Sequence, residues 1–163
     1  MAPSSVTDEI IQLLLSCPKI IQSKLPRSVP KAKHLEQNLD VRSADGQHFF
    51  TLIVRQSTMV SDSYSCGLLW HPSTSQKLML TRYNGSDHEH YNPMEESSFE
   101  DACHIHRATE RYIAAGRKAE HYAEQTTRYN NVNEAMACLM ADCNISWQSP
   151  PSSSTDTQFV LTF

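Results

Sequence analysis

The sequence lacks any long apolar segment. Its longest apolar run covers residues 10–15, is interrupted by Gln12, and has no basic stretch before it. A membrane-spanning helix needs about 20 apolar residues, and a signal peptide needs a basic region before its apolar core. We therefore expect neither feature, and predict a cytoplasmic protein without a membrane partner.

An excess of positive charge is also missing. The 163 residues carry 14 Lys and Arg against 18 Asp and Glu, which gives a formal net charge of −4. Binding of nucleic acid through the charge of the whole surface is therefore not indicated. Any basic site has to be local.

Closely paired cysteines are missing as well. The five cysteines are an odd number, lie far apart, and form no C-x-x-C pair. This pattern predicts neither a disulfide framework nor a thiolate zinc site. We expect free and mostly buried thiols.

Hydrophobic periodicity predicts helices towards both ends of the chain and strands between them. Apolar residues recur at helical spacing over residues 7–17 and, after a capping Asn131, up to Cys143. A short helix over residues 108–115 is expected to end at Gly116. Short β-branched and aromatic runs predict consecutive antiparallel strands at residues 49–55, 64–70, 77–83 and 102–106.

These elements predict one α+β domain over residues 1–145. We expect an antiparallel sheet of three to five strands, covered by the C-terminal amphipathic helix, with the N-terminal helix added to the same core. Residues 18–35 are rich in Lys, Arg and Pro, and are predicted to form an extended basic connector, either a solvated linker or an arm that follows phosphates. Residues 146–163 are predicted to form a flexible tail rich in Ser and Pro.

Two H-x-H pairs are the strongest chemical signal in the sequence. They are His88 with His90 and His104 with His106. In an extended strand, residues i and i+2 share a face, so each pair points two imidazoles the same way. If the strand that ends near Tyr83 pairs antiparallel with the strand that carries His104, the two pairs converge at one end of the sheet.

The first interpretation of this cluster is cleavage of RNA without a metal or other cofactor, as in a toxin-like endoribonuclease. Among His88, His90, His104 and His106, one imidazole would take the proton of a 2′-hydroxyl and another would protonate the leaving oxygen, while Arg107 would stabilise the phosphorane charge. The predicted RNA-binding residues are Arg82, Tyr83, Asn84, Arg111 and Tyr112.

Three alternatives remain open at this point. The same four histidines could bind zinc or nickel, with Glu89 or Glu110 adding a carboxylate. They could instead only satisfy backbone groups and one another. The chain could also be a non-catalytic partner-binding protein, of the antitoxin, defence or phage inhibitor type, with the apolar residues 159–163 adding a strand to another chain.

Part of the sequence resembles a known group of proteins. The resemblance rests on residues 78–85 (LMLTRYNG), 87–92 (DHEHYN) and 103–107 (CHIHR), followed by the helix of residues 131–145. This segment of the sequence, residues 78–145, resembles small bacterial proteins of the TumE type, which are the toxins of toxin–antitoxin loci. The resemblance implies a compact α+β protein of bacterial or mobile-element origin that acts on RNA and is held by a protein partner such as an antitoxin.

Overall fold

Strands dominate the computed structural model, which describes residues 6–22 and 29–148. Of these residues, 43% lie in strands and 18% in helices. The strands are β1 (Lys19–Ile21), β2 (Val29–Pro30), β3 (His34–Ser43), β4 (Phe49–Ser57), β5 (Tyr64–Ser73), β6 (Gln76–Asn84), β7 (His90–Asn92), β8 (Ser97–Phe99), β9 (His104–Arg107), β10 (Ala123–Gln125) and β11 (Ile145–Trp147). The helices are α1 (Asp8–Ser16), α2 (Glu110–Ala114) and α3 (Val132–Asp142).

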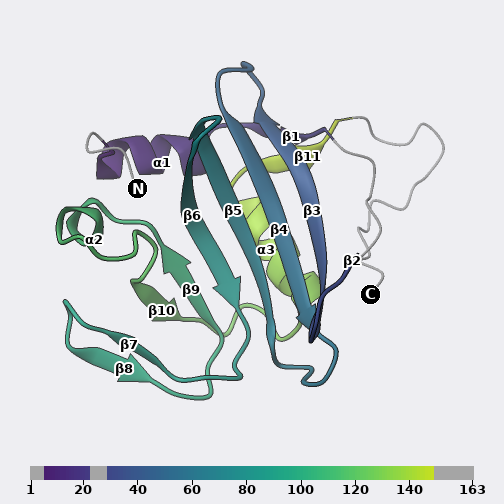
Figure 1. Cartoon of the computed structure of the whole chain (residues 1–163), viewed down its shortest axis with the longest axis vertical. Coiled ribbons are helices and arrows are strands. Elements are labelled where there is room, and N and C mark those ends of the chain that lie inside the picture. The colour runs from purple at the N-terminus through teal and green to yellow at the C-terminus, as the bar shows by residue number, and fades with distance from the viewer. Residues whose placement is uncertain (1–5, 23–28, 149–163) are drawn as a thin grey trace.

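One large sheet contains most of these strands. Within the described residues it has nine strands, in the order β10-β9-β6-β5-β4-β3-β1-β11 with β2 paired to β3, while β7 and β8 form a separate two-stranded sheet (Figure 1). The prediction of an α+β fold with three to five strands is therefore wrong. Helix α3 does lie against one face of the sheet, but β11 follows it and adds an edge strand, so α3 is not the terminal element of the fold (Figure 1).

The centre of the sheet follows the hydrophobic pattern of the sequence. Strands β4, β5 and β6 are consecutive and antiparallel, as predicted, and β9 pairs antiparallel with β6. Alternate side chains of β4 are buried on the face that α3 covers, among them Phe50, Leu52 and Val54. Asn131 caps α3 by accepting a hydrogen bond from the backbone N–H of Glu134 at 2.9 Å, as its sequence indicates.

The segment predicted as a basic connector contributes to the sheet. Strand β1 lies inside it, pairs antiparallel with β3 and parallel with β11, and carries the fully buried Lys19. The Lys19 ammonium donates to the backbone carbonyls of Leu15, Cys17 and Cys143 at 2.8 to 2.9 Å, and so joins the ends of α1 and α3. Lys24 and Arg27 of the predicted connector, and residues 149–163 of the predicted tail, lie outside the described residues.

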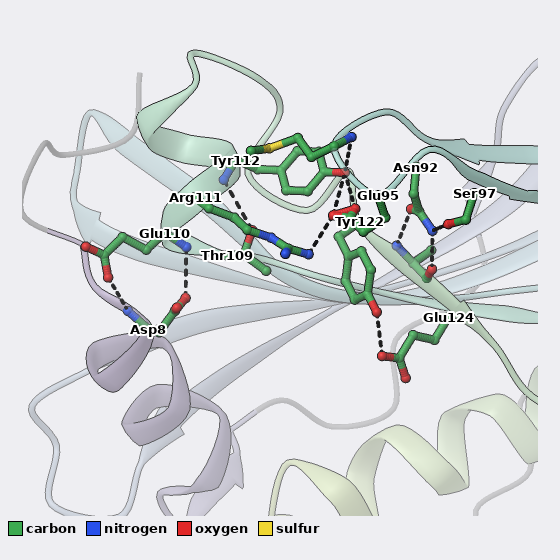
Figure 2. A network of polar contacts seen from close by, with 12 residues as sticks. Asp8, Asn92, Glu95, Ser97, Thr109, Glu110, Arg111, Tyr112, Tyr122 and Glu124 are labelled. Carbon is green, nitrogen blue, oxygen red and sulfur yellow. Dashed lines mark hydrogen bonds and ion pairs between the residues drawn. The ribbon is translucent and has the colours of Figure 1, made fainter.

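Helices α1 and α2 meet beside β9. Thr7 caps α1, and Arg107 at the end of β9 donates to the side chain of Gln12 in α1. Asp8 and Glu110 cap each other's helices: the N–H of Glu110 donates to Asp8 Oδ1 at 2.8 Å, and the N–H of Asp8 donates to Glu110 Oε2 at 3.2 Å (Figure 2). This contact places α2 next to the strand that carries His104 and His106.

The cysteines and the lengths of the helices can also be compared with the expectations from the sequence. All five cysteines are free; Cys66 and Cys143 are buried, and the other three are partly buried. None of the helices in the described part of the chain is long and apolar enough to cross a membrane.

Candidate metal centre

The two H-x-H segments meet at one end of the large sheet. In the antiparallel pairing of β6 with β9, Asn84 lies opposite His104 and Arg82 lies opposite His106. His104 and His106 share one face of β9 because they are two residues apart. Strand β7 brings His90 to this face, with its ring centroid 5.6 Å from that of His104 and 4.8 Å from that of His106. The predicted convergence is confirmed.

Three of these imidazoles are close enough to share one ion. His90, His104 and His106 each offer a ring nitrogen, and the three nitrogens all lie within 4.8 Å of one another. Nitrogen ligands of a tetrahedral zinc ion lie about 3.3 Å apart, as its bond length of about 2.0 Å requires. Shifts of roughly 1 Å at each nitrogen are therefore enough to close the group around a metal.

Backbone carbonyls determine which nitrogens of His104 and His106 carry a proton. His104 Nδ1 lies 2.9 Å from the carbonyl oxygen of Ala102, and His106 Nδ1 lies 2.8 Å from that of Glu120. A carbonyl oxygen can only accept, so Nδ1 of each neutral ring is the donor. Nε2 of each ring is left with its lone pair, which in His104 faces the amide Nδ2 of Asn84 at 3.5 Å.

The side-chain amide of Asn92 determines which nitrogen of His90 carries a proton. His90 Nε2 lies 2.9 Å from Asn92 Oδ1, while Asn92 Nδ2 donates to the backbone carbonyl of Ala123 at 2.8 Å and Asn92 Oδ1 accepts from the backbone N–H of Ala123 at 2.9 Å. These two backbone bonds set the orientation of the amide, so His90 Nε2 is the donor and Nδ1 keeps the lone pair. All three rings therefore have an oriented N–H and one basic nitrogen.

Burial keeps the three imidazoles neutral. It lowers the pKa of His90 and His104 below the usual value, and lowers the pKa of His106 to about 3, with the neighbouring histidines adding to the effect. His104 is fully buried, and the other two are partly buried. Neutral imidazole is the form that binds a metal ion.

The remaining histidines of this region lie at the edge of the group. His88 has a half-exposed ring whose Nδ1 is 2.8 Å from Asp87 Oδ1, and its centroid lies 4.9 Å from that of His104. His121 Nε2 donates to the carbonyl of Tyr91 at 3.1 Å, which ties β7 to the segment before β10. Neither belongs to the three-histidine group among the described residues. His88 lies next to His104 and stays a predicted site residue. His121, which the sequence interpretation did not include in the site, lies in the same histidine-rich region and lines the adjoining cavity.

Two predicted RNA-binding residues, Arg111 and Tyr112, contact the turn between β7 and β8, and the ring of Tyr112 also stacks on that of His121 with centroids 5.7 Å apart. The hydroxyl of the buried Tyr112 donates to Glu95 Oε2 at 2.7 Å, and Arg111 Nη2 pairs with Glu95 Oε1 at 2.6 Å (Figure 2). Glu95 lies between β7 and β8, so these contacts fix the hairpin that carries His90. The structure gives Arg111 and Tyr112 a positioning role at the site.

The other predicted residues divide between the two faces of the sheet. Tyr83 lies on the face covered by α3, where its hydroxyl donates to Asp142, and Arg107 points to α1. Arg82 and Asn84 lie on the histidine face, because residues directly opposite in an antiparallel pair share a face. Asn84 Nδ2 is 3.5 Å from His104 Nε2, and Asn84 Oδ1 is buried without a hydrogen-bond partner among the described residues.

A cavity of about 580 Å³ opens beside the three-histidine group. Its lining residues are Glu89, His90, Tyr91, Pro93, His106, Arg117, Lys118, Glu120 and His121. Glu89 is thus near the group without belonging to it, whereas Glu110 is engaged with Asp8. Neither carboxylate adds the metal ligand that the sequence suggested.

Comparison with known proteins supplies no assignment for this site. The chain matches no protein-family model, no curated protein and no solved structure. The resemblance to TumE-type toxins therefore stays a prediction, and the site is interpreted from its own geometry.

Proposed function

We propose that this protein binds one divalent transition-metal ion through His90, His104 and His106. Two observations carry the proposal: each ring donates one N–H to an oriented oxygen, and one ring nitrogen from each of the three histidines lies within 4.8 Å of the others. In metal sites, ligating histidines almost always donate their second nitrogen to a carboxylate, a carbonyl or water, which fixes the ring. The same feature supports a preorganised site here.

The ligand set narrows the choice of metal. Imidazole nitrogens suit zinc, nickel and copper, whereas magnesium and calcium prefer oxygen ligands. Zinc and nickel are therefore the first ions to test. Zinc adapts most easily to three histidines because it has no geometric preference from d electrons.

Cleavage of RNA by acid–base catalysis is less well supported. That mechanism needs one imidazolium that can donate a proton near neutral pH. Burial opposes protonation of His90, His104 and His106, and Arg107 contacts α1 instead of the histidines. RNA as a substrate, an antitoxin-type partner and a cytoplasmic location remain predictions from the sequence.

The proposal is tested with the full-length chain without a tag. After dialysis against metal-free buffer, zinc and nickel are titrated in competition with a chromophoric chelator, and bound metal is measured by elemental analysis. We expect close to one equivalent bound and a higher melting temperature with metal. Less than about a tenth of an equivalent, with no change in melting temperature, would show that the histidines serve only the fold.

A further inference from the structure

The three-histidine group leaves part of the metal's coordination open. No fourth His, Cys, Asp or Glu joins the group in the part of the chain that the structure describes. The nearest other imidazole, the half-exposed His88, lies outside the group, and its Nδ1 contacts Asp87. Structural zinc sites are usually closed by four protein ligands, whereas sites that bind a small molecule have three protein ligands and one open position.

The 580 Å³ cavity lies beside the three-histidine group. His90 and His106 form part of the cavity wall, whereas the fully buried His104 is not among the lining residues. A metal held by these rings would therefore be reached from the cavity past His90 and His106. The cavity volume lies within the range of small-molecule sites, about 300 to 1,000 Å³.

The charges of the wall favour a negative ligand once a metal is bound. The wall carries two acidic and two basic side chains, which cancel. The buried Glu120 pairs with Lys118 at 3.2 Å. The Arg117 guanidinium has no ion-pair or hydrogen-bond partner among residues 6–22 and 29–148, so it is the available cation on this wall. A divalent ion would make the wall positive overall.

We propose that this cavity binds an oxyanion, the carboxylate or phosphate group of a small molecule, with one oxygen on the metal and another on Arg117. The inference rests on the proposed metal site. A guanidinium stays charged at neutral pH and donates strong charge-assisted hydrogen bonds to carboxylate and phosphate oxygens. Arg117 thus recognises the anion, and the metal binds it in the open coordination position.

Cobalt-loaded protein provides the test, because the visible spectrum of Co²⁺ changes when its coordination changes. Phosphate and acetate are titrated separately into the loaded full-length chain, and the tighter of the two identifies the ligand class. We expect saturable spectral changes, with affinity lowered about tenfold in Arg117→Gln. Arg42→Gln, the same charge change on the distant strand β3, is the matched control and should leave anion affinity unchanged. Cobalt affinity should be the same in all three proteins.

Each negative result of this experiment overturns a stated part of the proposal. Absence of cobalt binding in the unmodified protein overturns both the metal site and the anion site. Normal cobalt binding with no spectral change from either anion overturns the anion site alone. Equal anion affinity in the unmodified protein and Arg117→Gln also overturns the proposal, because Arg117 would then not contact the ligand.

Discussion

Replacing His88 and His90 separately by glutamine distinguishes two histidines that the sequence presents as equivalent. His90 belongs to the three-histidine group, whereas the half-exposed His88 contacts Asp87 outside it. We expect His90→Gln to lose metal binding and His88→Gln to keep it within about twofold, because only His90 contributes a ligand.

The size of the effect follows from linkage between binding and folding. At a zinc concentration 100 times the dissociation constant, binding stabilises the folded protein by about 2.7 kcal/mol. For a chain of this size, that raises the melting temperature by roughly 5–10 °C. Loss of a partner that only orients a ligand already costs up to about 100-fold in affinity, so loss of the ligand itself should cost at least as much. At the same zinc concentration the stabilisation of His90→Gln then falls to about 0.4 kcal/mol, or roughly 1 °C.

Thermal unfolding of the two variants with and without zinc measures this difference. His88→Gln is the matched control, since it makes the same chemical change two residues away. If both variants respond to zinc as the unmodified protein does, His90 is not a ligand. If both lose the response equally, the division between His88 and His90 that the geometry indicates is wrong.

Three further predictions concern the support of the site and of the fold. Tyr112→Phe removes the hydrogen bond from the tyrosine hydroxyl to Glu95, so the free energy of unfolding measured with denaturant should fall by about 1 kcal/mol. Zinc affinity measured by chelator competition should fall a few-fold, and an unchanged zinc affinity would refute the positioning role. The hydrogen bonds of Arg128 lower the pKa of the Asp142 carboxyl below its ordinary 3.8, so the stability that this pair adds should be complete above about pH 5 and be lost as the pH falls through the lowered pKa. Asp142→Asn should therefore lower the free energy of unfolding by about 1 kcal/mol at pH 7 and by progressively less as the pH falls through the lowered pKa, and a loss that did not depend on pH would contradict this account. Lys19→Met leaves three carbonyl oxygens without their donor. The free energy of unfolding measured with denaturant should therefore fall by about 3 kcal/mol, while zinc affinity stays the same.

Local patterns in the sequence predict the centre of the fold well. Strands β4, β5 and β6 have β-branched or aromatic runs separated by turn residues, and α3 has an apolar face with a capping Asn131. Each of these signals depends on residues that are neighbours along the chain. The sequence therefore contains enough information to place these elements without knowledge of the rest.

The margins of the sheet depend on pairings between distant segments. Strand β1 has three residues, follows a proline and begins with a lysine, and it is stabilised by β11 at the other end of the described chain. In β3, charged and amide side chains alternate with Leu39 and Val41, so few apolar residues mark the strand. These strands are visible only once their partners are known, which is why the sheet was expected to be smaller.

The candidate site shows the same division between local and distant information. The H-x-H spacing on β9 is local, and it correctly predicts that His104 and His106 share a face. The oxygens that orient the rings come from the backbone of Ala102 and Glu120, and their positions depend on the fold and not on side-chain type. Likewise, the direction of Arg107 depends on where α1 packs.

The burial of the three imidazoles favours one of the two chemistries that the sequence left open. An acid–base pair requires a ring that gains and loses a proton near neutral pH, and burial opposes the gain in all three rings. A metal ion requires only the lone pair that each neutral ring keeps after its N–H has been donated. Because each N–H already has an oriented acceptor, the rings are held in place for binding through their second nitrogens. Proton transfer would use the same second nitrogens, so it is the burial of the three rings, and not their hydrogen bonds, that favours a cation over an acid–base pair.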